Sequence, residues 1–197
     1  EGAVYKISEL VKGNNIPVGT MEWEGKFGSL QPLLLPNDDP PSNPDMLSDV
    51  NKAELLQQHA VDMFVGDHDG HVGNLLLYKG HLRAIDKGQA FRFLASNEPE
   101  SLDPSFHNGN MNLSGKSYCK LLLVAWGKGE AEISPMAFAA MHKTVLRIQS
   151  LAEGSYLADL LQPIFEGLTV SDAQKKKMLA SVIARAKAYE DSWLTVL

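Results

Sequence analysis

The side chains best suited to chemistry lie close together between residues 65 and 91. This stretch reads VGDHDGHVGNLLLYKGHLRAIDKGQAF, and its carboxylates, imidazoles and amide are those of Asp67, His68, Asp69, His71, Asn74 and Asp86. Groups of these types bind metal ions or transfer protons. The spacing has to distinguish among a calcium loop, a transition-metal site and the loop of a phosphoryl-transfer enzyme.

The spacing excludes a calcium loop of the EF-hand type. Such a loop needs a Gly at its sixth position, for a sharp turn, and a Glu at its twelfth position, as a bidentate ligand. Counted from Asp67, the sixth residue is Val72 and the twelfth is Tyr78. Neither residue can serve the required purpose, so calcium binding of this kind is not expected.

A transition-metal site is a second interpretation. His68, Asp69 and His71 offer imidazole and carboxylate ligands of the kind that such metals use. The other histidines are scattered, and the sequence contains no second cluster of His or Cys ligands. Because a local Asp/His group is a weak signal by itself, a His/Asp metal-dependent hydrolase remains an alternative rather than the favoured prediction.

Phosphoryl transfer fits the spacing better. This chemistry uses one carboxylate to orient or deprotonate the attacking hydroxyl, and an Asn with a second carboxylate to hold Mg²⁺ against the nucleotide phosphates. Asn74 follows Asp69 by five residues, as in the catalytic loop of protein kinases. A short hairpin follows, and Asp86 stands at its end with Gly88 two residues later. We expect the hairpin to bring Asp86 back beside Asn74, so that both oxygen ligands face one metal site.

These residues resemble the motifs of the atypical kinases related to phosphatidylinositol 3/4-kinases. The loop of that family reads Asp-Arg-His-x-x-Asn and its metal motif reads Ile-Asp-x-Gly-x-Ala-Phe, which match residues 69–74 and 85–91 here. Actin-fragmin kinase and the HipA-type kinases look similar in the same places. Upstream, GSLQPLLL (28–35) is similar to the strand and hinge of type II phosphatidylinositol 4-kinases, and the helix at 54–64 corresponds to the one before the catalytic loop.

The resemblance implies a role for each matching residue. Asp69 would be the catalytic Asp, and His71 would support the loop or the transferring phosphate. Asn74 and Asp86 would bind Mg²⁺. The adenine of ATP would be held by the backbone of the hinge-like residues Gln31, Pro32, Leu33 and Leu34. One departure is Gly70, which stands where the family usually has Arg.

The elements that must position these residues follow from hydrophobic periodicity and from Gly, Pro and capping signals. Helical spacing predicts helices at 4–11, 48–64, 117–126, 135–152, 155–166 and 171–195. The strand signals predict a pair within 16–36 that turns near 24–26, and a hairpin of strands 74–78 and 81–85. Proline and polar composition predict loops at 36–44 and 97–116.

This order of elements predicts an α+β, mainly α fold that resembles the C-lobe of a protein kinase, with a short strand pair and a catalytic hairpin. Residues 1–36 would be a remnant of the N-lobe, comprising a helix like αC, two strands and the hinge. Residues 37–197 would form the helical C-lobe, with the catalytic loop at 66–74 and the metal-binding loop at 85–91. The glycine-rich loop and the strand Lys of a complete kinase have no counterpart in the sequence. We therefore expect either a separate N-terminal segment that completes the N-lobe or an inactive, regulatory pseudokinase.

Composition limits the partners. The chain of 197 residues carries a net charge of -6 and no dense Lys/Arg stripe, which argues against nucleic acid. No apolar run approaches the roughly 20 residues of a membrane span, so no transmembrane segment is expected. The single cysteine excludes an internal disulfide framework and fits a cytoplasmic location. We expect a kinase that uses ATP and Mg²⁺ and acts on a protein hydroxyl rather than a lipid, because lipid kinases need a basic or apolar membrane-facing surface.

Overall fold

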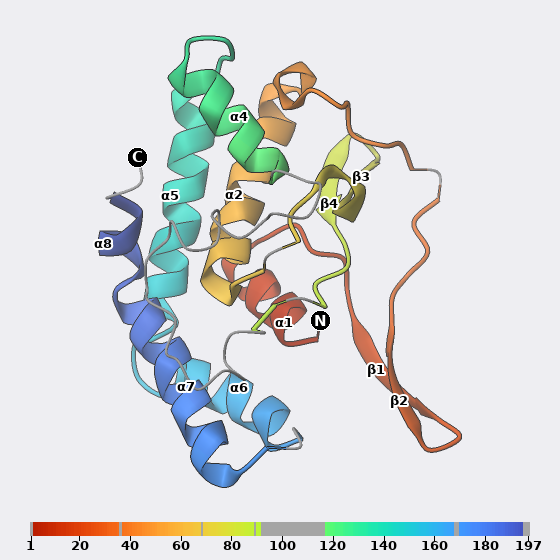
Figure 1. Cartoon of the computed structure of the whole chain (residues 1–197), viewed down its shortest axis with the longest axis vertical. Coiled ribbons are helices and arrows are strands. Elements are labelled where there is room, and N and C mark those ends of the chain that lie inside the picture. The colour runs from red at the N-terminus through yellow and green to blue at the C-terminus, as the bar shows by residue number, and fades with distance from the viewer. Residues whose placement is uncertain are drawn as a thin grey trace.

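The computed structural model describes residues 2–35, 37–67, 69–88, 90–91, 117–167 and 170–194, and it is mainly helical in this part of the chain (Figure 1). The helices are α1 (Gly2–Val11), α2 (Asp49–Val65), α4 (Tyr118–Gly127), α5 (Pro135–Ser150), α6 (Tyr156–Glu166), α7 (Asp172–Lys187) and α8 (Tyr189–Leu194). The strands are β1 (Gly19–Trp23), β2 (Lys26–Leu30), β3 (Leu75–Tyr78) and β4 (His81–Ala84), and two short 3-10 turns are Pro44–Met46 and Val72–Asn74. The prediction of an α+β, mainly α fold is confirmed.

Helix α2 lies at the centre of the molecule, between α5 on one side and the β3–β4 hairpin on the other (Figure 1). Its N-cap is Ser48, whose side chain accepts a hydrogen bond from the Asn51 backbone N–H. It ends at Gly66, which adopts the left-handed conformation with φ 62° that glycine tolerates best. Leu56 and Phe64 are fully buried in the core that α2 shares with its neighbours. A central, buried helix therefore delivers the chain to the residues of interest.

The predicted hairpin is present as β3 and β4, which pair antiparallel and are each one residue shorter than expected at the outer end. Lys79 and Gly80 form the two-residue turn with φ of 52° and 79°, as a type I′ turn requires. Each strand also pairs on its outer edge. Asp38 and Leu77 exchange two backbone hydrogen bonds of 2.9 and 2.8 Å, and the segment at 14–16 pairs with Ala84.

Helix α2 holds the hairpin through Glu54. One carboxylate oxygen lies 2.7 Å from His81 Nδ1, and the other accepts the Leu82 backbone N–H at 2.7 Å. Leu82 is fully buried, so its N–H needs a partner inside the protein. The hairpin is therefore fixed against the central helix by directed bonds as well as by apolar packing.

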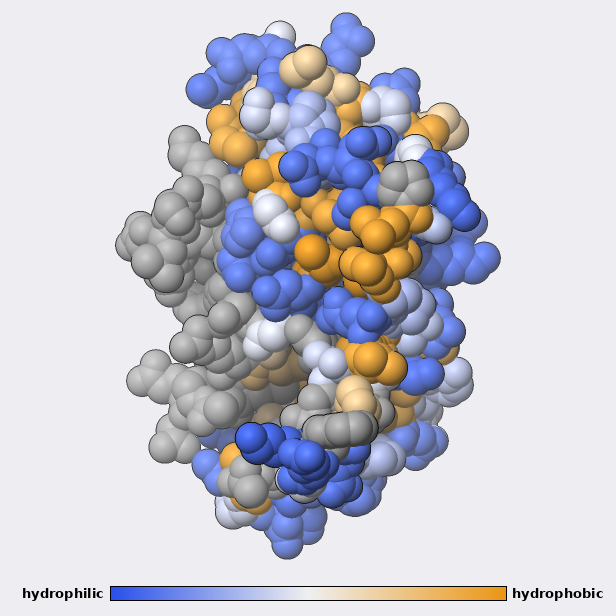
Figure 2. All heavy atoms as spheres, turned by 90° about the vertical axis from the view of Figure 1, so that its right-hand side faces the viewer, coloured by the Kyte–Doolittle hydropathy of each residue, from blue (hydrophilic) through white to orange (hydrophobic). Residues whose placement is uncertain are grey.

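Strands β1 and β2 form a separate antiparallel ribbon that extends away from the helices (Figure 1). The predicted turn is present at Glu24 and Gly25, both of which have positive φ. Figure 2 views the molecule from this side, where hydrophobic residues lie among hydrophilic ones. Leu30, Leu33 and Leu35, at the end of the ribbon and just beyond it, are 60%, 82% and 63% exposed.

The C-terminal region differs from the prediction. The helix expected at 171–195 is interrupted at Ala188, which separates α7 from α8. The next residue, Tyr189, is buried, its hydroxyl donates to the Ala60 carbonyl of α2, and its ring packs edge-on against Phe64 at 5.4 Å. This contact with the central helix spans more than 100 residues of sequence, so local periodicity does not reveal it.

The polar loop expected at 97–116 lies outside the described residues. Within the described part of the chain, none of the helices combines the length and the apolar character that crossing a lipid bilayer requires.

Candidate functional site

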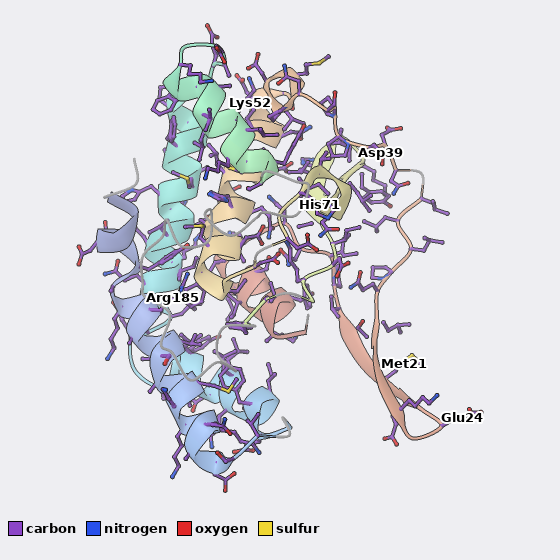
Figure 3. All side chains as sticks on the ribbon, in the orientation of Figure 1. Met21, Glu24, Asp39, Lys52, His71 and Arg185 are labelled. Carbon is purple, nitrogen blue, oxygen red and sulfur yellow. The ribbon has the colours of Figure 1, made fainter. Side chains whose placement is uncertain are left out.

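The two loops singled out by the sequence lie side by side. The Ile85 backbone N–H donates to the Asn74 carbonyl at 3.0 Å, which continues the hairpin ladder by one bond. Farther along, the Phe91 N–H donates to the Val65 carbonyl at 2.8 Å. The segment that leaves α2 and the segment that leaves β4 are thus bonded to each other at both ends. Figure 3 labels His71, which belongs to the first of these segments. Asp86, next to Ile85, belongs to the same small region as Asn74.

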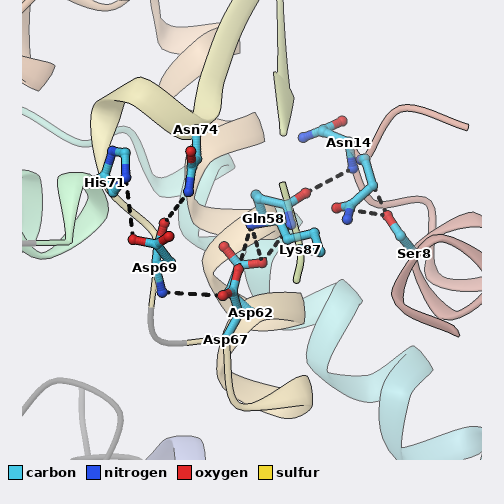
Figure 4. Close-up of polar contacts among 10 residues, drawn as sticks. Ser8, Asn14, Gln58, Asp62, Asp67, Asp69, His71, Asn74 and Lys87 are labelled. Atoms are coloured by element: carbon cyan, nitrogen blue, oxygen red, sulfur yellow. Dashed lines mark hydrogen bonds and ion pairs between the residues drawn. The ribbon is translucent and has the colours of Figure 1, made fainter. Parts of the chain in front are cut away.

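The predicted catalytic loop is closed by its own hydrogen bonds (Figure 4). The Asn74 side-chain amide donates to the Asp69 carbonyl at 2.8 Å, and the Asn74 backbone N–H donates to the His71 carbonyl at 3.0 Å. The Tyr118 N–H, at the start of α4, donates to the Gly70 carbonyl at 2.9 Å. The spacing of five residues between Asp69 and Asn74 is what allows the amide to reach back across the loop.

His71 orients the Asp69 carboxylate. Its Nδ1 accepts the Gly73 backbone N–H at 3.0 Å, so the neutral ring carries its proton on Nε2. That Nε2 lies 3.2 Å from Asp69 Oδ1. The side chains of Asp69 and His71 are 37% and 40% exposed, so the carboxylate is both oriented and open to a solvent-borne hydroxyl.

The same hydrogen bonds bear on the hydrolase alternative. Both ring nitrogens of His71 have partners in this arrangement, which leaves no lone pair for a metal ion. His68 lies outside the described residues. Among the residues that are described, no group of three or more His, Cys, Asp or Glu side chains is placed to hold a metal.

Asn74 and Asp86 carry oxygen atoms that other residues leave available. Asp86 is exposed, has a positive φ of 50°, and its carboxylate forms no hydrogen bond or ion pair within the described part of the chain. Asp tolerates this left-handed conformation better than most residues, but such positions cluster at functional sites. The Asn74 amide nitrogen is used within the loop, whereas no described residue donates to its Oδ1. Carboxylate and amide oxygens are ligands that suit Mg²⁺, so the residues fit that ion, and their assignment as its ligands remains a prediction.

The predicted adenine-binding residues Gln31, Pro32, Leu33 and Leu34 form an extended segment between β2 and the Asp38 contact with β3. Leu33 is 82% exposed and its side chain extends into solvent. The expected contacts with adenine come from the backbone of these residues.

A buried group that sequence reasoning missed lies beneath the two loops. We call Asp62, Asp67 and Lys87 the buried ion triad (Figure 4). Lys87 Nζ lies 2.8 Å from Asp67 Oδ2 and 3.0 Å from Asp62 Oδ1, and the side chains are 4%, 0% and 12% exposed in the order Lys87, Asp67, Asp62. The sequence contained one signal, since Asp62 interrupts the apolar run AVDMFV of a buried helix.

The triad is electrostatically tightly coupled. Burial raises the pKa of Asp62 to about 6, an effect that Lys87 opposes and Asp67 reinforces. Burial disfavours the charged form of Lys87, but the two carboxylates outweigh it and raise the pKa of that lysine above its ordinary range. Lys87 therefore stays charged at neutral pH and pairs with two carboxylates, which satisfies the rule that buried charges need partners.

Polar contacts continue from the triad to the N-terminal helix (Figure 4). Gln58 donates from Nε2 to Asp62 at 2.8 Å and accepts the Asn14 backbone N–H at 3.2 Å.

Between the triad and the catalytic loop is a cavity of about 10 Å³, lined in part by His59 and Ser117. This volume suits at most one water molecule, so the space beneath the loop is closely packed.

Comparison of the chain with protein-family profiles, with curated proteins and with solved structures found no match.

Proposed function

We propose that this chain is the catalytic lobe of an ATP- and Mg²⁺-dependent phosphotransferase of the atypical kinase class, which phosphorylates a hydroxyl group. The observation that carries the proposal is the Asn74–Ile85 backbone bond. It joins the loop that contains Asp69 and Asn74 to the segment that contains Asp86, which is the juxtaposition that phosphoryl transfer requires of a base and two metal ligands.

In this proposal Asp69 accepts or orients the proton of the attacking hydroxyl, and His71 fixes the direction of its carboxylate. Asn74 and Asp86 would hold Mg²⁺ through their oxygens. When bound, that ion would neutralise the charge on the nucleotide phosphates. The backbone at 31–34 would contact the adenine.

The acceptor is more consistent with a protein than with a lipid surface. The net charge of -6 disfavours approach to an anionic membrane. A separate N-terminal segment that supplies the glycine-rich loop and its Lys would complete the nucleotide site, and a cytoplasmic location would give access to ATP.

The test is to measure ATP binding by calorimetry, with and without Mg²⁺, and phosphate transfer from γ-labelled ATP to a generic protein acceptor. Asp69→Asn is expected to keep ATP binding and to lower transfer by at least about 100-fold, the range for a general base. Asp86→Asn is expected to abolish the Mg²⁺ dependence of binding. Asp191→Asn, an exposed change on α8, is the matched control and should leave both measurements unchanged. If the native chain binds neither ATP nor Mg²⁺, the proposal of an active kinase is wrong.

A second candidate is an inactive regulatory module. It is favoured because Lys87, Lys6 and Lys26 are not placed to act as the Lys of a kinase nucleotide site. Lys87 is buried beside the loops, but Asp62 and Asp67 already hold its ammonium group. Lys6 is 54% exposed on α1, and Lys26 begins β2 at the ribbon turn. An inactive module would bind its partner equally well with Asp69→Asn and Asp86→Asn. A His/Asp hydrolase, in contrast, would tolerate Asp86→Asn and lose activity with Asp69→Asn.

A further inference from the structure

We infer, on the basis of the proposed function, that Asp67 and Lys87 are positioning residues that set the distance between the catalytic loop and the metal-binding loop. Asp67 lies at the start of the catalytic loop and contacts a residue of each loop. Its Oδ1 accepts the Asp69 backbone N–H at 3.1 Å, and its Oδ2 binds Lys87 Nζ at 2.8 Å. Lys87 directly follows Asp86 in the chain. One carboxylate thus connects the backbone of the proposed base to the neighbour of the proposed metal ligand.

The burial of this pair makes the connection rigid. The side chains of Asp67 and Lys87 are 0% and 4% exposed, so water does not compete for their ion pair. Backbone bonds close the same region on both sides, from Ile85 to Asn74 and from Phe91 to Val65. Lys87 therefore lies in the middle of a segment whose two ends are already fixed, where a displaced side chain would move the adjacent Asp86.

The third member of the triad has a different position, which makes it a natural control. Asp62 also binds Lys87, at 3.0 Å, but it lies in α2, and the other partner of its carboxylate is Gln58 of the same helix. A purely structural triad would make the two carboxylates equivalent for activity. If Asp67 positions the loops, its replacement should lower phosphate transfer. Replacement of Asp62 should mainly lower stability.

The first experiment compares Asp67→Asn, Asp62→Asn and Lys87→Met by thermal unfolding and by backbone amide exchange in NMR. We expect Asp67→Asn and Lys87→Met to increase exchange at the Ile85 amide by about tenfold or more, while Asp62→Asn leaves this amide within about twofold of the native rate. This readout needs neither ATP nor activity. Equal exchange at the Ile85 amide in all three variants would overturn the inference, whatever the chain catalyses.

Because Lys87→Met leaves two buried carboxylates without their cation, that variant can fail to fold. The neutral triple variant, with Asp62→Asn, Asp67→Asn and Lys87→Met, avoids this problem. Neutral replacements of a buried ion group commonly preserve stability, and Asn at position 67 still offers an oxygen to the Asp69 N–H. We expect the triple variant to melt close to the native temperature. Its Ile85 amide should still exchange faster than in the native chain.

The second experiment measures phosphate transfer with the same variants. In the neutral triple variant, kcat should fall by about 10- to 100-fold, since small displacements of reacting groups have effects of this size. Asp62→Asn should stay within about threefold of native. A triple variant that is as stable and as active as the native chain would show that the triad is only structural. Absence of transfer by the native chain would instead refute the proposed function, and the exchange data would still decide the positioning role.

Discussion

The pH dependence of stability should be governed by two buried groups that act in opposite directions, and His59 is the better one to perturb. His59 lies in α2 and is 7% exposed. Burial, with a smaller contribution from the charge of Lys120, lowers its pKa from 6.5 to about 4. Above pH 6.5 the ring is neutral in both the folded and the unfolded chain. As the pH falls toward 4, only the unfolded chain takes up the proton, so stability is lost.

The size of this effect follows from the two pKa values. A difference between 6.5 and about 4 corresponds to about 3 kcal/mol of unfolding free energy at 1.36 kcal/mol per pKa unit. Asp62 acts with the opposite sign, because its pKa is raised from 3.8 to about 6 and the folded chain holds the proton more tightly. As the pH falls from 6 toward 4, Asp62 therefore adds stability while His59 removes it. The native chain should show only a shallow net dependence from this pair.

The assay is urea unfolding at pH 7, 6, 5 and 4, with variants His59→Gln and Asp62→Asn. Relative to the native chain, His59→Gln should gain about 3 kcal/mol between pH 7 and pH 4, because the residue that resists protonation is gone. Asp62→Asn should change in the other direction over the same interval. The difference between variant and native is compared at each pH, so that titration of exposed carboxylates cancels. If the curve for His59→Gln runs parallel to the native curve over this range, the reasoning about the buried ring is refuted.

Three further predictions concern stability and reactivity. Glu54→Ala should lower the free energy of unfolding by about 2 kcal/mol, since the buried Leu82 N–H loses a charged acceptor; thermal or urea unfolding measures this, and a change below about 0.5 kcal/mol would contradict it. Ser171→Ala should cost about 1 kcal/mol in the same assay, because it removes the capping box with Gln174 at the start of α7, whereas a Ser171→Thr control should stay close to native. Cys119 is buried, and burial raises the pKa of its thiol, so Ellman's reagent should react slowly with the native chain and rapidly in urea; equal rates in the two conditions would show that the thiol is accessible.

Part of the site could be predicted from the spacing of its residues in the sequence. The five-residue interval from Asp69 to Asn74, followed by a two-strand hairpin, is a local pattern, and the structure contains both the closed loop and the hairpin. Hairpin register follows from the two-residue turn at Lys79 and Gly80. Once that register is fixed, Ile85 must lie opposite Asn74. The proximity of the two proposed loops could therefore be predicted without any knowledge of the core.

Other features of the site could not be predicted from the spacing of residues. Nothing in the sequence indicates which nitrogen of His71 bears the proton, because that depends on the Gly73 N–H at 3.0 Å. Asp67 is one of the reactive side chains of the stretch but has no assigned role in the motif, and Lys87 occupies an x position of Ile-Asp-x-Gly-x-Ala-Phe. Both are buried, and they pair across 20 residues of sequence. Such a pair forms only when the end of α2 and the segment after β4 pack against each other.

Local signals were sufficient to predict the helices, the hairpin and the order of the reactive residues, because hydrophobic period, caps and tight turns act over a few residues. They also predicted the mainly helical fold class. The end of helix α7 depends on long-range packing, since Tyr189 is buried against Phe64 of α2. Packing also decided the charge state of the interior, since the pKa values of His59 and Asp62 depend on burial and on neighbours from distant segments. Local interactions specify elements, whereas burial and electrostatics depend on how these elements pack together.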